Sequence, residues 1–357
     1  MINETMEALM MKIAVDAMGG DHAPKVVVNG IERARDQHPD LEFMLFGDPA
    51  AVQAQLSNPE RITIVPTTEE IEMGEEPVRA IRRKKDSSLV RAAMAVKNGE
   101  ADAFFSAGNT GAILAAGLFI VGRIKGIDRP GLTSILPVAL PNAAQATRFV
   151  YLDSGANAES KERNLVQFAQ LGRFYASQVL GVANPRVALL NNGAEADKGD
   201  SFHKAVHQLL AADDSLNFVG NVEASELLHG KADVVVSDGW TANAALKATE
   251  GTAKLVLHLL KDGILNGGWR AKLGYVFLKP VFKKIAKLMT PSNYGGAVLL
   301  GLKAPVVKAH GAADEKAIVA TIDQIQTMLT SQVVQKTAAY FQAAEENGQT
   351  VDKPGEN

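Results

Sequence analysis

The residues with the clearest chemical potential stand in short loops in which glycine neighbours Asn, Asp, Ser or Thr. The first loop follows an apolar run that ends at Asp16-Ala17, and it contains Gly19, Gly20 and His22. Related stretches further along the chain read GNTGA (108–112), SGAN (154–157), NGAE (192–195) and GWTAN (239–243), and Glu223 follows a sixth strand-like run. Glycine permits positive φ angles and close approach of a ligand to the backbone, and N–H groups at a helix start attract an anion. These loops are therefore candidates for binding a small anion.

The loops gain meaning from the elements around them, because each follows a strand-like run. Runs typical of strands occupy 12–17, 41–47, 61–66, 101–107, 147–153, 185–191, 216–221, 232–238, 297–302 and 305–310. Helical patterns occupy 25–37, 49–57, 86–98, 110–122, 158–180, 241–262 and 313–346. This alternation predicts a three-layer α/β/α fold around a mostly parallel sheet. Ligands of such sheets gather at the carboxyl ends of the strands. Six strand ends therefore predict one shared site, although any single loop also fits a glycine turn with an N-cap.

Composition places the chain among ordinary globular proteins. It has 357 residues, of which 46% are hydrophobic and 22% charged, with a net charge of −3, so the protein as a whole is not expected to bind nucleic acid. The absence of cysteine excludes disulfides, thiolate metal sites and a cysteine nucleophile, and it fits the cytosol. Neither a secretory signal nor a transmembrane helix is predicted. We expect a short extension at 1–11, a single catalytic domain over 12–346 and a disordered tail at 347–357.

Several familiar motifs are missing. No GxGxxG follows the first strand, and the sequence contains no GxxxxGK[ST], HExxH or GxSxG, which argues against a dinucleotide site, a P-loop, a zinc protease and a hydrolase elbow. The seven histidines are scattered without metal-ligand spacing. A two-metal carboxylate site made by Asp16, Asp21, Asp153 and Asp238 is the one metal alternative. We expect no metal and no cofactor.

The stretch AIRRKKDSS (80–88) places four cations in a row before Asp86. One interpretation is a solvated helix end followed by a helix that Asp86 caps. The other is that Arg82, Lys84 or Lys85 faces the strand ends and holds a phosphate group.

A second basic segment, 263–313, contains eight Lys and Arg residues and no Asp or Glu. Within it, 269–289 is amphipathic, and Pro280 predicts two shorter helices with the proline in the first turn of the second. We expect a protruding basic helical hairpin over about 263–292. It could form a dimer interface, lie on a membrane surface or dock an acidic carrier protein. The candidate contact residues are Arg270, Lys272, Lys279, Lys283, Lys284 and Lys287.

Eight motifs, in order, carry a resemblance that spans most of the chain, from about Lys12 to His310. They read IAVDAMGGDHAP, KKDSS, SAGNTGA, LDSGAN, LLNNGAEADKG, GNVEASELLHGKADVVVSDG, LKATEG and AHGAAD. Together they resemble the PlsX family of phosphate acyltransferases. The chain departs from the family's usual DGF-x-GN at Trp240 and Ala242, and at Asn192 where the family usually has an aliphatic residue.

The resemblance implies transfer of a fatty acyl group from acyl-carrier protein to inorganic phosphate. The acyl phosphate product would serve phospholipid synthesis through a membrane glycerol-3-phosphate acyltransferase. The resemblance also implies the fold of phosphate acetyltransferases and isopropylmalate dehydrogenases, a homodimer, and a cytoplasmic protein attached peripherally to the inner face of the cell membrane.

Under that reaction the loop residues acquire roles. Phosphate is itself a nucleophile, so the enzyme must hold a dianion beside a thioester and stabilise the developing oxyanion. Helix starts at 108–111 and 154–157 could supply N–H donors, Lys84 or Lys198 could neutralise phosphate, and His22 or His310 could orient it or protonate the leaving thiolate. The catalytic candidates are Asp16, His22, Lys84, Asn109, Lys198 and His310. The phosphate- or thioester-binding candidates are Gly19, Gly20, Gly108, Thr110, Gly111, Ser154, Gly155, Asn157, Gly239 and Asn243.

Two alternatives remain open at this point. A CoA-dependent phosphate acetyltransferase or a metal- and NAD-dependent decarboxylating dehydrogenase would use a similar fold. A scaffold that works at the membrane surface through its basic hairpin would need no catalysis.

Overall fold

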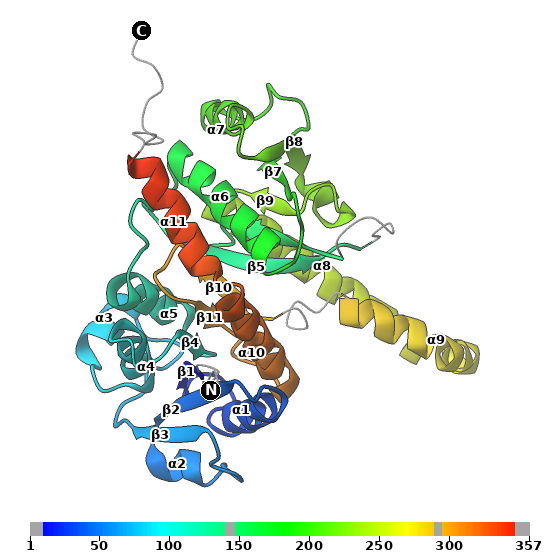
Figure 1. The fold of residues 1–357 in the computed structure, drawn as a ribbon. Coiled ribbons are helices and arrows are strands. Elements are labelled where there is room, and N and C mark those ends of the chain that lie inside the picture. Colours follow the sequence, from blue (N-terminus) through cyan, green and yellow to red (C-terminus); the bar gives the residue numbers. More distant parts are fainter. Residues whose placement is uncertain (1–9, 140–146, 289–294, 347–357) are drawn as a thin grey trace, which may run out of the picture. The chain divides into compact units, whose positions relative to one another are not determined.

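The computed structural model describes residues 10–139, 147–288 and 295–346, and the chain in it divides into two compact units (Figure 1). Unit 1 comprises 1–130, 178–180 and 294–357, and unit 2 comprises 131–177 and 181–293. The expected extension and tail lie almost entirely outside the described residues. That the chain forms one catalytic domain over 12–346 stays a prediction.

Unit 1 is built on parallel strands whose carboxyl ends share one edge. Its strands are β1 (Met11–Asp16), β2 (Leu41–Gly47), β3 (Ile62–Pro66), β4 (Ala103–Ser106), β10 (Ala297–Leu300) and β11 (Val306–Lys308). They are ordered β3-β2-β1-β4-β11-β10, and among them β10 alone runs antiparallel to its neighbour β11. Nearly all residues of β1 and β4 are buried, as expected of strands that are covered on both faces.

Helices cover both faces of the unit 1 strands. They are α1 (Lys25–Gln37), α2 (Pro49–Gln53), α3 (Pro77–Arg83), α4 (Ser88–Lys97), α5 (Thr110–Ala116), the π-helical turn η1 (Gly117–Val121), α10 (Glu315–Thr330) and α11 (Val333–Glu346). Figure 1 shows α1 and α10 side by side on one face, and α3, α4 and α5 on the other. Gly30 of α1 allows the close contact with Ile318 of α10.

Unit 2 has its own strands, ordered β5-β6-β9-β7-β8. They are β5 (Gly131–Pro137), β6 (Arg148–Leu152), β7 (Arg186–Asn191), β8 (Asn217–Glu223) and β9 (Val234–Val236). Only β5 and β6 pair antiparallel among these. The helical elements are α6 (Glu162–Gln178), α7 (Ser201–Ala211), the 3₁₀ turn η2 (Ala224–His229), α8 (Gly239–Asn266) and α9 (Gly268–Leu288). Phe149, Tyr151 and Leu190 lie in a buried core beneath the start of α8.

The predicted mostly parallel α/β architecture is confirmed, and several details are corrected. The expected helix 313–346 is two helices, because the chain turns at Ser331-Gln332, where Gln332 has φ of 54°. The expected cap Asp86 is replaced by Ser87, whose hydroxyl accepts the N–H of Val90.

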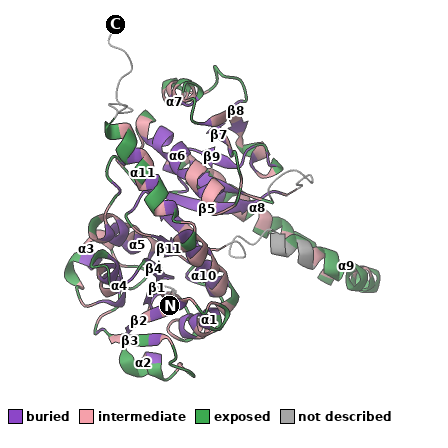
Figure 2. Ribbon diagram, in the orientation of Figure 1, coloured by how far each residue is buried: buried purple, intermediate pink, exposed green. Residues whose placement is uncertain are grey.

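Pro280 does not divide the amphipathic segment. It lies inside the single helix α9. Proline has no N–H, so one backbone carbonyl of the preceding turn loses its helical hydrogen bond. Because this helix is exposed, that carbonyl can bind water. Helix α9 packs against α8, and Figure 2 shows exposed residues along its described part. Whether the two form the protruding hairpin remains a prediction.

Candidate functional site

Asp16 is the buried centre of the strand-end loops of unit 1. It is the last residue of β1, and its carboxylate accepts hydrogen bonds from the hydroxyls of Ser88 (2.5 Å) and Ser106 (2.7 Å). Burial raises the pKa of this carboxyl, although the two hydroxyls act in the opposite direction. Asp16 therefore ties the start of α4 and the end of β4 to the first glycine loop, which is a positioning role.

The first glycine loop packs too closely for side chains. A Cβ at Gly19 would lie 2.5 Å from the Asp16 carboxylate and 2.8 Å from the backbone nitrogen of Gly108. Gly20 has φ of 116°, which favours glycine, and the next residue, Asp21, donates its N–H to the carbonyl of Gly311 at 2.8 Å. The loop after β1 thus lies against the loops after β4 and β11.

The two candidate histidines of unit 1 lie in these joined loops. His22 is exposed and follows Asp21. His310 is also exposed, and its Nδ1 accepts the N–H of Ala312 at 3.1 Å, which leaves Nε2 as the nitrogen that carries a proton in the neutral ring. The loops that carry the two histidines thus lie against each other, and the catalytic roles of the histidines stay predictions.

Asn109 and Lys84 are already engaged by protein groups. The Asn109 amide donates to the carbonyls of Glu72, Met73 and Glu75, and its Oδ1 caps α5. The Lys84 ammonium pairs with the Glu75 carboxylate, which raises the pKa of Lys84 and lowers that of Glu75. This arrangement makes Asn109 a loop anchor and leaves Lys84 without free charge for phosphate. In the adjoining turn Thr110 begins α5, and Gly111 lies against Pro77.

Unit 2 contains a second cluster, and the carboxylate of Asp153 lies at its base. Asp153 is fully buried after β6, and it accepts the N–H groups of Leu132, Gly155, Ala156 and Asn157 as well as the Asn157 side-chain amide, at 2.8–3.0 Å. Burial raises the pKa of Asp153, and these donors oppose the shift.

The loop 154–157 therefore does not present its N–H groups as expected. The N–H groups of 155–157 surround Asp153, and Ser154 N donates to the carbonyl of Leu132 at 2.7 Å. The loop instead supports what lies above it. A Cβ at Gly239 would lie 2.2 Å from the Asn157 carbonyl oxygen, so only glycine lets α8 begin there. One turn later, Asn243 lies against Gly155.

Ala242, at a departure from the family pattern, belongs to the core. It is buried, and its carbonyl accepts the Tyr151 hydroxyl at 3.1 Å. Close ligand approach at residue 242 is thus excluded by burial, and the substitution leaves the exposed side of α8 unchanged. Burial also raises the pKa of Tyr151, which keeps this hydroxyl protonated as a donor.

His203 joins the starts of two helices, and it was not among the predicted site residues. Asp200 caps α7, and Asp238 caps α8. The ring of His203 lies between them, with Nδ1 2.7 Å from Asp200 and Nε2 3.7 Å from Asp238. Hydrogen bonds from His203, chiefly from its backbone, lower the pKa of Asp200. Two short motifs in the sequence could have pointed to it: Asp-x-x-His at 200–203, and Asp238-Gly239 just after β9, the strand next to β7.

Lys198 stands on the loop that leads into α7. The loop folds back on β7, because Asn191 Nδ2 donates to the Lys198 carbonyl at 3.2 Å and Gly199 lies against Asn191 and His203. The Lys198 side chain is exposed, and no carboxylate in the described part of the chain pairs with it. Contacts within unit 2 thus connect the loop of Lys198, through Gly199, to His203 and to the start of α8, where Gly239 and Asn243 lie.

Three of the six predicted contact residues of the basic segment have described side chains, and all three are exposed. Arg270, Lys272 and Lys279 lie on α9, and the Arg270 guanidinium lies 5.4 Å from the ring centroid of Trp269. The side chains of Lys283, Lys284 and Lys287 fall outside the described residues. No helix in the described ranges is long and apolar enough to span a bilayer.

The metal alternative fails on the chemistry of its carboxylates. No cluster of three or more potential ligands occurs in the described ranges. Each Asp16 oxygen already accepts a hydroxyl, and five N–H donors surround the two oxygens of Asp153, which disfavours these two carboxylates as cation ligands.

Known proteins resemble this chain over most of its length. Residues 11–336 match the family model described as "Fatty acid synthesis protein". A phosphate acyltransferase of Limosilactobacillus reuteri is 71% identical over 335 residues, which cover 94% of this chain and 97% of that protein. One from Limosilactobacillus fermentum is 77% identical over 298 residues, which cover 84% and 86%.

Solved structures match the fold at low sequence identity. A phosphotransacetylase from Streptococcus pyogenes superposes with a TM-score of 0.57 at 18% identity, covering 92% of this chain and 96% of that one. A branched-chain phosphotransacylase from Enterococcus faecalis gives 0.55 at 15% identity, covering 90% and 99%. The fold is thus that of the phosphotransacetylases. With its family model and relatives taken together, the chain belongs to the PlsX family of fatty acid synthesis proteins, which are phosphate acyltransferase enzymes.

Proposed function

We propose that this protein transfers a fatty acyl group from the thioester of acyl-carrier protein to inorganic phosphate. The reaction forms a bond between the acyl carbon and a phosphate oxygen and breaks the bond between that carbon and sulfur. The proton of hydrogen phosphate ends on the released thiol. Since phosphate is the nucleophile, the reaction needs no acyl-enzyme, which agrees with the absence of cysteine.

The observation that supports this proposal most is that, in unit 2, His203 links the loop of Lys198 to the start of α8. The N–H groups of Gly239 and Trp240 open α8 and have no acceptor in the described structure, while Asp238 accepts the N–H of Thr241. The unpaired Lys198 ammonium belongs to the connected loop. A helix start and a free lysine together suit a phosphate dianion.

The neighbouring side chains have roles that fit this chemistry. Asn243, one turn into α8, would donate its side-chain amide to the oxyanion that forms on the thioester carbonyl. His203 would hold the starts of α7 and α8 in register through Asp200 and Asp238. Asp153, through the 154–157 loop, would fix the position of Gly239. Within unit 1, Gly19, Gly20, Gly108 and the two histidines stay proposed site residues of that unit, with Asp16 as their support.

The reaction also defines the proposed partners and location. Acyl-carrier protein would deliver the substrate, and a membrane glycerol-3-phosphate acyltransferase would consume the acyl phosphate. We place the protein in the cytoplasm as a homodimer that binds the inner face of the cell membrane. What supports the membrane contact is α9, where Trp269 and Phe277 are 70% and 75% exposed beside basic residues.

The decisive experiment supplies purified protein with palmitoyl-carrier protein and labelled phosphate, and it follows acyl phosphate and free carrier thiol together. We expect equal amounts of both products. A parallel reaction with acetyl-CoA distinguishes the acetyltransferase alternative. Product from acetyl-CoA with none from the carrier thioester would replace our proposal, and no acyl phosphate from either donor would refute it.

A further inference from the structure

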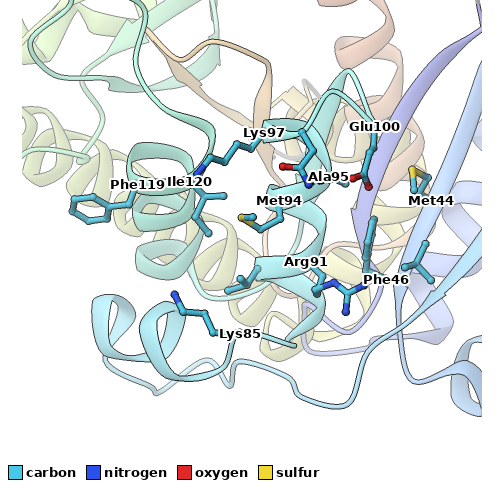
Figure 3. A pocket seen from close by; sticks show the side chains of 13 residues that line it. Met44, Phe46, Lys85, Arg91, Met94, Ala95, Lys97, Glu100, Phe119 and Ile120 are labelled. Atoms are coloured by element: carbon cyan, nitrogen blue, oxygen red, sulfur yellow. Dashed lines mark hydrogen bonds between the residues drawn. The ribbon is translucent and has the colours of Figure 1, made fainter.

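A groove in unit 1 runs along α4, apart from the residues assigned to acyl transfer. It has a volume of about 580 Å³ and is lined by α4, by β2 and β3, and by η1. Figure 3 shows Met94 of α4 between Ile120 on one side and Phe46 and Met44 on the other. A volume of this size is within the range of small-molecule sites.

The lining of the groove is mainly apolar and adaptable. Met44, Phe46 and Val65 come from the strands, Met94 comes from α4, and Phe119 comes from η1. Phe119 is 59% exposed although it is aromatic. Methionine side chains adjust to flexible ligands, so this lining suits an aliphatic chain better than a rigid polar molecule.

The two ends of the groove differ in charge. Lys85 and Arg91 lie at the end near the start of α4, whereas Lys97 at the other end shares the lining with Glu100. Arg91 pairs with Asp86, and the Lys85 ammonium contacts only the carbonyl of Ile81 at 3.2 Å within the described residues. The Lys85 end therefore has cationic charge that no carboxylate compensates fully.

We propose that this groove binds a single-chain anionic amphiphile, with the chain along α4 and the anionic head at Lys85 and Arg91. That the chain is a fatty acyl chain rests on the proposed function, since a fatty acyl phosphate and the fatty acid that its hydrolysis releases both have this form. The groove also gives a role to the KKDSS segment, whose Lys84 is held by Glu75 and whose Lys85 faces the groove.

The test measures binding of laurate to the whole protein by titration calorimetry, without phosphate or carrier. We expect one saturable site. Met94→Glu should weaken binding about tenfold or more, because an unpaired carboxylate in an apolar groove repels both chain and head. Lys85→Glu should weaken it several-fold. The matched control Arg82→Glu changes a neighbouring exposed cation outside the lining, and it should alter binding by no more than about twofold, as for an exposed surface charge.

Two further arms identify the head group and the ligand class. Dodecyltrimethylammonium, with the same chain and a cationic head, should bind far more weakly than laurate. Dodecyl phosphate should compete with laurate, which would extend the site from carboxylate to phosphate heads. Thermal unfolding of each variant verifies that it is folded.

Unsaturable binding, or equal laurate affinity in wild type and a folded Met94→Glu variant, would overturn the proposal. So would binding of an amphipathic peptide in the groove with no binding of laurate. The acyl transfer assay uses other substrates, so the two proposals can fail separately. If the protein forms acyl phosphate but does not bind laurate in the groove, this inference alone is refuted. If it binds laurate in the groove but forms no acyl phosphate, the proposed function alone is refuted.

Discussion

The carboxylate of Asp153 accepts both the backbone N–H and the side-chain amide of Asn157, each at 2.8 Å. The many N–H donors on this buried carboxylate fix the shape of the loop 154–157. Since Gly239 lies directly against this loop, the geometry at the start of α8 depends on a residue that need not touch substrate.

Asp153→Asn should therefore harm both stability and activity. The new amide keeps one acceptor oxygen and turns an NH₂ group toward N–H donors, which leaves buried groups unpaired. We expect a loss of about 2–3 kcal/mol in the free energy of unfolding and a lower rate of acyl phosphate formation. Denaturant unfolding measures the first effect. The control Asp197→Asn, in an exposed loop, should be neutral; equal stability of the two variants would contradict the role given to Asp153.

Gly239→Ala tests the close approach at the start of α8. Its Cβ would meet the Asn157 carbonyl oxygen at 2.2 Å and the Asp153 carboxylate at 2.8 Å, so backbone must move. We expect destabilisation of about 1–3 kcal/mol together with a raised KM for phosphate. Gly251→Ala in the same helix meets no atom within 4 Å and should be stabilising by up to about 1 kcal/mol. Thermal unfolding of the pair separates a local clash from a general effect of alanine.

Asp16 makes a prediction about pH. Burial raises its pKa above the ordinary value of 3.8, so the folded state favours the protonated carboxyl. Its contribution to stability is complete below pH 3.8 and is lost as pH rises through the pKa of the folded state. Asp16→Asn lacks this titration, so the stability of the variant should rise relative to that of wild type as pH rises from about 4. Parallel unfolding curves between pH 4 and 8 provide the measurement, and a pH-independent difference would contradict the assignment.

The sequence was most informative where one physical signal dominated. Apolar runs ended by glycine predicted β1, β2, β4, β6 and β7, because buried parallel strands need little beyond such runs. The strand β5 was missed, since its sequence GLTSILP begins with glycine, ends with proline and contains two polar residues, so its apolar run is short. The prediction of one helix over 313–346 was wrong because a single residue, Gln332 with its positive φ, ends one helix before the next begins.

The candidate site was predictable as a set of loops and not as a set of contacts. Glycine spacing marked Gly19 and Gly239, where other parts of the chain pack against the backbone, and Gly155, whose φ of 129° favours glycine; ligand approach at these positions stays a prediction. Periodicity carries no information about which side chain meets which. The pairing of Lys84 with Glu75 and the place of His203 between Asp200 and Asp238 arise from tertiary packing, which a single sequence does not encode in any local pattern.

Lys198→Ala addresses the proposed phosphate contact. Removal of a free ammonium near a dianion should raise the KM for phosphate more than it changes stability, since the side chain is exposed. We expect a loss of about tenfold or more in kcat/KM, corresponding to a charge-assisted hydrogen bond of about 1.5–3 kcal/mol. Lys204→Ala, an exposed lysine on α7, is the matched control and should behave as wild type. Should Lys198→Ala keep the wild-type KM, phosphate binds elsewhere.

Phe277→Glu tests the membrane contact of α9. Phe277 is 75% exposed, so its replacement should not unfold the helix. At the membrane interface, glutamate would remove the apolar contact of the phenyl ring and would be repelled by anionic lipid. We expect binding to vesicles with phosphatidylglycerol to fall by about tenfold, since burial of a phenyl group is worth about 1.5–3 kcal/mol. Flotation of vesicles measures the bound fraction, and solution acyl transfer from carrier thioester should stay unchanged. Val219→Glu on β8, 45% exposed, introduces the same charge away from α9 and should bind like wild type. Equal flotation of all three proteins would place any membrane contact on another surface.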